Sequence, residues 1–322
     1  MTKELLSRLI VKCENIGINI RAITFDMGNM GFLKDCGVIR EKKNCFANPV
    51  HPEKVIYLFH DVPHLIKLAR KHCLTKGFSA PDENGKYQNL KKENFEEIMK
   101  NDGKDLKLCP KLKGVHIHSQ GLQNQRVYLA TQLFSASVSK ALLFLKGDSY
   151  SVQASIISKF NKWFDTMNSR TFCTVAERCP FGSRELEQNQ ALHEMSKLMD
   201  DLRFCTNSQS STKKPFQIGI QISIRSTLSL FEELKGEGTS FLCTTRLNQD
   251  TLESFFSRVR GIGGNDTHPT PVQAIRRIRT LLMGKSPQHI VCHPNVKEDD
   301  APGSVKQVCG NPVTQDYYWW TP

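Results

Sequence analysis

The sequence lacks several features that would assign it to a familiar class of protein. No run of about 18 apolar residues occurs, so a membrane-spanning helix is not expected. The first twenty residues carry Lys3, Glu4 and Arg8 and do not form the apolar segment of a signal peptide. No internal repeat is found. With 322 residues, 39% of them hydrophobic and 24% charged, we expect one large or two ordinary domains of a soluble protein.

Motifs for metal and phosphate binding are also sparse. Eleven cysteines are present, but no CxxC pair occurs. Cys173 and Cys179 are close in sequence, yet neither they nor His116 and His118 have the usual spacing of zinc ligands, so zinc stays only an alternative. The segment 283–287 imitates the end of a P-loop but lacks the loop's first glycine. We expect reduced thiols, and any nucleotide binding must do without a P-loop.

The charge balance is basic. The chain has 44 lysines and arginines against 32 aspartates and glutamates, which gives a net charge of +12. An excess of this size favours phosphate-rich partners such as nucleic acid, because binding releases counterions. The alternative is a charge that only keeps the protein soluble, since net charge bears on partners and not on fold.

The start of the chain predicts a helix followed by a strand that ends in an aspartate. Apolar residues recur on one face of residues 2–16, which is typical of a helix. Residues 18–25 then alternate as in a strand, and Asp26 follows directly. Glycines from Gly28 onward predict a turn, and residues 32–37 predict a helical turn.

The same order, strand then aspartate then helix, is predicted a second time. The continuous apolar run 55–59 favours a buried strand. Asp61 follows it and can cap the next helix, which has Pro63 in its first turn and continues through residues 64–72.

The middle of the chain is mainly helical. Residues 79–94 are polar and predict a loop, and residues 206–215 predict a polar linker. Residues 216–234 predict a helix or an interrupted helix. Because this block separates the two strands from the next motif, it has the layout of an insertion domain. Its other predicted helices cover residues 95–99, 127–146, 151–168 and 185–203.

A compact motif occupies residues 243–264. Its apolar positions predict an amphipathic helix, which Asn248 can cap and three glycines end; a second helix is predicted at 271–282. Asp250 and Glu253 fall together on the face opposite the apolar one, where two carboxylates can share one cation or one water. The alternative is an ordinary solvated face.

Three segments together resemble the P-element and THAP-type family of DNA transposases. LNQDTLESFFSRVRGIGGNDTHPTP resembles the family's C-terminal catalytic signature. ITFDMGNMGFLKDCGV resembles its strand and turn with a catalytic aspartate, and VIYLFHDVPHLIKLARKH resembles the following strand and helix. The resemblance implies an RNase H-like core in which Asp26 and Glu253 are catalytic and bind divalent cations, Mg²⁺ or Mn²⁺. The roles of Asp61 and His64, which match the family's Asp-x-Pro-His, are left as structural or accessory.

The helical block resembles the family's GTP-binding insertion. In FNKWFDTMNSR, Phe164 can stack on guanine, Asp165 can accept its edge donors and Asn168 can address its other edge. Without the resemblance, Phe164 would be read as core and the two polar residues as surface. The other expected nucleotide contacts are Asp105, Lys111 and Asp250, with Arg126 in a similar segment.

The family pattern also sets limits on what we expect from this sequence. The family's first catalytic aspartate should lie well upstream of Asp26, and neither it nor the THAP zinc module is found, so we expect a truncated chain that alone neither cuts nor joins DNA. The predicted fold class is α/β plus all-α, a truncated RNase H-like core interrupted by a large helical insertion. The predicted parts are the N-terminal core (1–70), the GTP-binding insertion (71–240), the C-terminal core (241–285) and a flexible tail (286–322).

Three functions remain open on sequence alone. The first is part of a nuclear transposase that cleaves and joins DNA with GTP as cofactor. The second is a non-catalytic, host-adopted protein that binds GTP or DNA, and the third is a helical scaffold without nucleotide. The expected partners are DNA (transposon ends and target), GTP and a second copy of the chain, with no membrane.

Overall fold

The computed structural model describes residues 2–26, 43–101, 107–205, 213–262, 266 and 268–283. Within these residues it has two three-stranded sheets and a helical module. The predicted mixture of an α/β core with a helical insertion is confirmed. The first sheet has the order β1-β3-β2: β1 (Ala22–Phe25) runs parallel to β3 (Val55–His60), and β2 (Cys45–Ala47) runs antiparallel to it. The predicted strands are thus confirmed, and β2 was not predicted.

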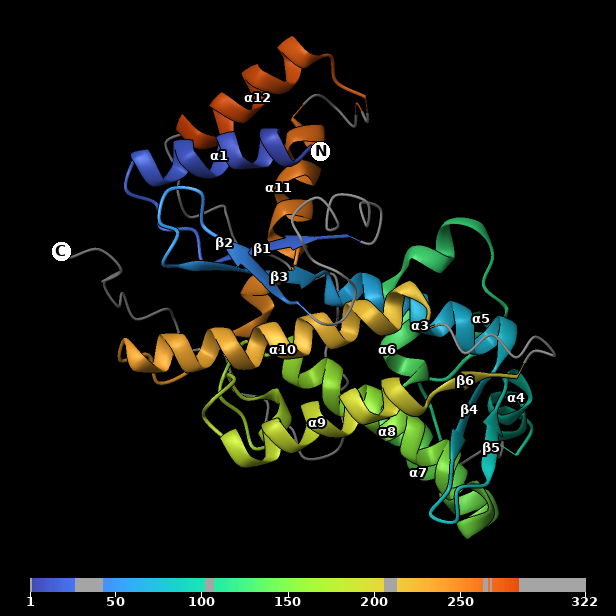
Figure 1. Cartoon of the computed structure of the whole chain (residues 1–322). Coiled ribbons are helices and arrows are strands. Elements are labelled where there is room, and N and C mark those ends of the chain that lie inside the picture. The colour runs from blue at the N-terminus through green and yellow to red at the C-terminus, as the bar shows by residue number, and fades with distance from the viewer. Residues whose placement is uncertain are drawn as a thin grey trace.

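Alternate residues of β3 face two helical layers. Ile56 and Leu58 pack with Leu6 and Ile10 of α1 (Lys3–Asn15), whereas Tyr57 and Phe59 pack with residues of α10 (Pro215–Gly236). Figure 1 shows α1 on one side of the sheet and α10 on the other. Since both faces are covered, the strand can be the continuous apolar run that the sequence contains.

Two serines of α10 bind the backbone of β3 directly. Ser223 Oγ accepts from the backbone N–H of His60 at 2.9 Å, and Ser226 Oγ donates to the carbonyl of Leu58 at 2.6 Å. α10 is one unbroken helix, which settles the alternative that the sequence left open. It lies in the range predicted for the insertion yet covers the core sheet, and the predicted domain boundaries stay a prediction.

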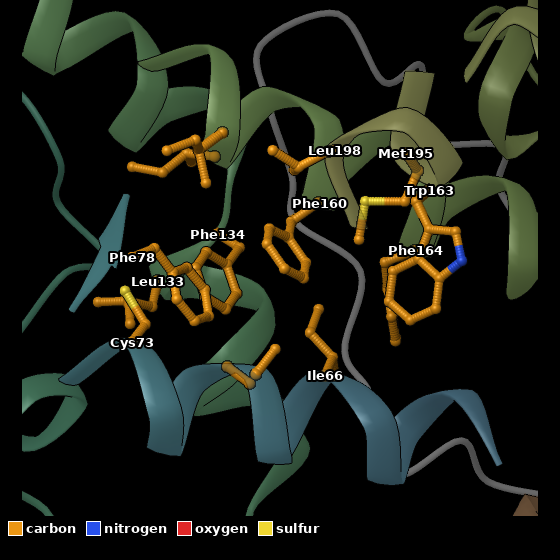
Figure 2. Packing of buried hydrophobic residues seen from close by; sticks show 14 of the residues in the cluster. Ile66, Cys73, Phe78, Leu133, Phe134, Phe160, Trp163, Phe164, Met195 and Leu198 are labelled. Atoms are coloured by element: carbon orange, nitrogen blue, oxygen red, sulfur yellow. The ribbon is translucent and has the colours of Figure 1, made fainter. Parts of the chain in front are cut away.

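The helical module packs around a cluster of aromatic rings. The rings of Phe134 and Phe160 stack at 4.6 Å, and Phe78 stacks on both of them. Figure 2 shows these rings with Ile66 of α3 and Leu198 of α9 around them. The helices are α3 (Val62–Lys76), α4 (Lys92–Lys100), α5 (Gly114–His118), α6 (Val127–Leu133), α7 (Ala136–Lys146), α8 (Ser151–Met167) and α9 (Glu185–Asp201).

The prediction of a loop at 79–94 is wrong. This segment forms most of a hairpin, β4 (Phe78–Pro81) and β5 (Tyr87–Leu90), and β6 (Arg203–Phe204) pairs with β4. Asp82 Oδ1 accepts from the N–H groups of Asn84 and Lys86 and closes the turn. The polar composition misled the prediction because the exposed turn residues 83–86 and Asn89 stand between the buried residues Phe78, Ala80 and Leu90.

The predicted helix at 127–146 is also wrong in its continuity. It consists of α6 and α7, separated at Phe134 and Ser135, and Ser135 Oγ accepts from the N–H of Val138 as the N-cap of α7. By length and composition the stretch Val127–Met167 is apolar enough for a membrane span, but it contains this break and much of it packs into the aromatic cluster.

The C-terminal motif forms two helices, α11 (Asp250–Gly261) and α12 (Pro271–Met283), after a short 3-10 turn at Thr244–Leu247. The prediction that Asn248 caps α11 is wrong: the N-cap is Gln249. Asn248 instead donates its side-chain amide to Asn168 Oδ1 at 2.9 Å. The predicted turns at 28–37 and the tail after 285 lie outside the described residues.

Candidate functional site

Two aspartates stand side by side at the ends of the parallel strands. Phe25 of β1 pairs with His60 of β3, so Asp26 and Asp61 follow at the same edge of the sheet. The N–H of Asp61 donates to the carbonyl of Phe25 at 3.1 Å and extends the pairing by one step. Asp26 is exposed, whereas Asp61 is only 4% exposed.

The carboxylate of Asp61 binds the starts of two helices. Its Oδ2 accepts from the N–H of His64 at 3.0 Å, which is the predicted N-cap of α3. Its Oδ1 accepts from the N–H of Gln249 at 2.8 Å, the residue that begins α11. The amino end of α11 is therefore attached to the strand ends, although it lies far along the chain.

Further bonds hold the residues before α11 against β1. Thr24 Oγ1 donates to the carbonyl of Leu247 at 2.7 Å, and Gln249 Nε2 donates to the carbonyl of Thr24 at 3.4 Å. The first turn of α11 then presents Asp250, which is buried, and Glu253, which is exposed. In Figure 1 the helix starts beside the sheet and runs away from it.

The charges of both predicted metal ligands influence the pKa of His64. Burial and the charge of Lys67 lower the pKa of His64, while the charges of Asp61, Asp26 and Glu253 act in the opposite direction. The carboxylates of Asp26 and Glu253 thus both act on the same imidazole. Asp26 follows the strand end beside Asp61, and Asp61 binds the start of the helix that carries Glu253.

The donor set suits a hard divalent cation. Mg²⁺ and Mn²⁺ prefer carboxylate oxygens, and Mg²⁺ keeps several waters, so two exposed carboxylates can serve as its protein ligands. Among the described residues, no group of three or more His, Cys, Asp or Glu side chains is arranged to hold a metal. Asp26 and Glu253 are the two exposed carboxylates that the sequence predicts as ligands of such a cation.

Asp250 differs from its neighbour Glu253 in environment. Burial, and next the charge of Asp61, raises the pKa of Asp250, and the charge of Arg170 opposes this shift. Arg170 Nη2 lies 3.4 Å from Asp250 Oδ2. The carboxylate of Asp250 thus pairs with an arginine that follows α8. This ion pair connects α11, which carries the predicted metal ligand Glu253, with the predicted guanine contacts of α8.

The predicted guanine contacts lie at the end of α8 and have partners within the chain. Phe164 is 5% exposed and belongs to the aromatic core, as Figure 2 shows. Asp165 Oδ2 accepts from Arg178 Nε at 3.2 Å and from Asn161 Nδ2 at 3.0 Å. Burial raises the pKa of Asp165 to about 6, against the charge of Arg178. Asn168 accepts from Asn248, as described above.

The other predicted nucleotide contacts lie apart from this group in sequence. Lys111 is between the buried Cys109 and Leu112. Arg126 precedes α6 and donates to the hydroxyl of Tyr128 at 3.2 Å. Asp105 lies outside the described residues.

Sequence reasoning missed the residues that join the two predicted sites. Thr244 is fully buried and donates to the carbonyl of Thr166 at 2.7 Å, while it accepts from the N–H of Ser169 at 2.9 Å. Arg170 and Arg178 were missed too, because their partners are acidic residues elsewhere in the chain. The run Arg-Leu-Asn-Gln-Asp at 246–250 was the sequence signal that could have indicated this junction, because its Asn248 bonds to Asn168 at the end of α8.

The thiols of Cys173 and Cys179 lie 3.9 Å apart. No third cysteine or histidine joins them within the described residues as a metal ligand. They are free thiols in this structure.

Comparison with known proteins supplies a family for both parts of the chain. The family model "TNP-like, GTP-binding insertion domain" matches residues 63–180, and "TNP-like, RNase H C-terminal domain" matches residues 245–273. The chain is 32% identical over 313 residues to the transposable element P transposase of Drosophila melanogaster, covering 94% of this chain and 40% of that protein. A solved structure, the Drosophila P element transposase strand transfer complex, matches with a TM-score of 0.79 and 31% identity over 90% of this chain and 66% of the solved chain.

Proposed function

The chain belongs to the P-element type of DNA transposases, and from this membership we propose that it takes part in metal-dependent cleavage and strand transfer of DNA, with GTP as a cofactor. The observation that supports the proposal is geometric: Asp26 and Asp61 follow the paired ends of β1 and β3, and Asp61 Oδ1 accepts from the N–H of Gln249 at the start of the helix that carries Glu253. The matched relative is a transposase, and this chain spans 40% of its length.

We assign the chemistry of the phosphodiester to the two exposed carboxylates. Asp26 and Glu253 would hold Mg²⁺ or Mn²⁺, which stabilises the charge on the reacting phosphate oxygens and lowers the pKa of a bound water. The sheet and α11 keep these carboxylates oriented. Asp250 is paired with Arg170, and we assign it to the nucleotide site and not to the metal.

We assign guanine recognition to the end of α8. A carboxylate can accept both donors of the guanine edge, and Asp165 is a carboxylate with a raised pKa held by neutral and cationic donors. In this proposal guanine takes over the bonds that Asp165 makes with Arg178 and Asn161. Asn168, Asp250, Lys111 and Asp105 would complete the contacts, and Phe164 would support the base from the core.

Three exposed arginines support binding to DNA. Arg260 of α11 and Arg276 and Arg279 of α12 are exposed on the two helices that follow the carboxylates. Arginine donors bind phosphate oxygens, and the net charge of +12 adds a long-range attraction. We therefore propose that the protein binds DNA and acts in the nucleus of a eukaryotic cell.

The first experiment tests the nucleotide. Binding of a fluorescent GTP analogue should be displaced by GTP and not by ATP, and Asp165→Ala should weaken it by about tenfold or more. Asp148→Ala, at an exposed position in the turn before α8, is the matched control and should bind as the unchanged chain does. Equal displacement by ATP, or unchanged affinity in Asp165→Ala, would contradict the assignment.

The second experiment separates the two candidate functions. A labelled DNA carrying a terminal repeat is incubated with the chain and Mn²⁺, with Glu253→Gln as the comparison. A non-catalytic role that consists of binding GTP and DNA is the second candidate. Binding without nicking is expected of the chain alone under both candidates, whereas nicking that disappears in Glu253→Gln would show that the chain is catalytic by itself and would exclude the second candidate.

A further inference from the structure

Asp61 joins four elements through one buried side chain and its own backbone. Its N–H binds the end of β1, its carboxylate binds the starts of α3 and α11, and it directly follows β3. We infer that Asp61 is a positioning residue, which holds the amino end of α11 against the strand ends and so sets the place of Glu253 relative to Asp26. This inference rests on the proposed function, because it concerns the same metal-binding carboxylates.

A carboxylate suits this position better than any neutral side chain. The first N–H groups of a helix have no partner within the helix and carry partial positive charge. Asp61 offers one oxygen to His64 and the other to Gln249, so a single negative charge serves two helix starts. Asparagine has only one acceptor oxygen, and its NH₂ group would face a backbone N–H. Asp61→Asn therefore breaks one of the two bonds with little change in volume.

The geometry favours positioning over direct metal binding. Both oxygens of Asp61 accept from backbone N–H groups, and the residue is 4% exposed. Asp26 and Glu253 are exposed by contrast. Asp61 thus acts on the helix, and the helix carries Glu253.

The effect should be local, because other bonds hold the preceding residues. Thr24 binds Leu247, and Asn168 binds Asn248. Loss of the bond between Asp61 and Gln249 leaves these two hydrogen bonds in place and releases only the backbone from Gln249 into the first turn of α11. We expect the first turn of α11 to open more often while the rest of the chain stays folded.

The test uses two variants at this contact. Asp61→Asn keeps one acceptor oxygen for the two N–H donors, and Gln249→Pro removes the donor of one bond, together with the side-chain bond of Gln249 to Thr24, while keeping the carboxylate. Gln249 has φ −86°, and Asn248 before it has φ −101° and ψ 166°, so proline fits the backbone there. Asp82→Asn is the matched control, since Asp82 also accepts from two N–H groups but in the distant β4–β5 turn.

Two quantities are measured on the full chain: the hydrogen exchange of the amides at 251–254 and the affinity for Mn²⁺ by electron paramagnetic resonance. In both Asp61→Asn and Gln249→Pro, exchange should quicken and Mn²⁺ affinity should fall, each by about tenfold. The control should match the unchanged chain in both.

The remaining outcomes are distinguishable. Unchanged hydrogen exchange in Gln249→Pro would overturn the inference. Mn²⁺ binding that is lost in Asp61→Asn but kept in Gln249→Pro would overturn it too, because Asp61 would then be a metal ligand. Faster exchange in both variants, with no Mn²⁺ bound even by the unchanged chain, would support the anchoring by Asp61 and overturn the metal site of the proposed function.

Discussion

The side-chain amide of Asn248 donates a hydrogen bond of 2.9 Å to Asn168, which ends α8. One residue belongs to the predicted guanine contacts, and the other precedes the helix that carries Glu253. Together with Arg170 and Asp250, this pair joins the two proposed sites without an intervening element. A ligand that moves the end of α8 would therefore act directly on the start of α11.

Thr244 should be essential to this junction. Thr244→Val keeps the shape of the side chain but leaves the N–H of Ser169 and the carbonyl of Thr166 without their partner in a fully buried place. We expect a loss of about 1–3 kcal/mol in the free energy of unfolding, measured with urea. Thr75→Val, whose hydroxyl bonds to a carbonyl on an exposed part of α3, should change stability by less than about 0.5 kcal/mol. Equal effects would contradict the role of Thr244.

Gly182 should tolerate no side chain. Its φ is +96°, and a Cβ there would lie 2.1 Å from the ring of Phe231, which is buried against Phe181. Gly182→Ala should lower the free energy of unfolding by about 2 kcal/mol or more, seen as a lower midpoint in thermal unfolding. Gly236→Ala, at the end of α10 with open space around it, is the control and should be neutral or slightly stabilising. A similar midpoint for both variants would count against the packing described here.

His60 should make the protein sensitive to acid. Burial lowers its pKa to about 4, and neither ring nitrogen has a hydrogen-bond partner among the residues that the structure describes. The unfolded chain binds the proton more tightly, so stability should be full above pH 6.5 and fall as the pH drops from about 6.5 to about 4. His60→Phe keeps an aromatic ring against Phe25 and removes the titration.

Unfolding by urea at pH 4.5 and pH 7 measures this contribution. The loss of stability between the two values should be smaller in His60→Phe than in the unchanged chain. His193→Phe, at an exposed position on α9, should leave the loss as it was. An identical pH dependence in all three proteins would show that His60 contributes nothing.

Arg277 should fasten α12 to α11. Its guanidinium donates to the carbonyls of Val259 and Arg260 at the end of α11 and to Asp266 Oδ2 at 2.9 Å. Arg277→Met should raise the hydrogen exchange of α12 by about tenfold, because these bonds are lost. Arg276→Met, on the exposed face, should weaken DNA binding and its salt dependence without changing exchange. The reverse pattern would refute this division of roles.

The sequence alone determined the elements that depend on neighbouring residues. The apolar stripe of α1, the buried run of β3 and the cap that Asp61 gives α3 are local patterns, because helix and strand periods and N-cap bonds span only a few positions. The resemblance to a transposase family was likewise readable from contiguous motifs.

Only the tertiary structure decided where the distant partners meet. Asn248 reads as a helix cap, yet its amide bonds to Asn168. The β4–β5 hairpin reads as a loop because its buried Phe78 packs against Phe160 of α8, far along the chain. Asp165 reads as a free surface carboxylate, yet it is bound to Arg178. Each of these contacts joins residues that are not neighbours in the sequence and that only the complete fold brings together. Local periodicity carries no information about such contacts.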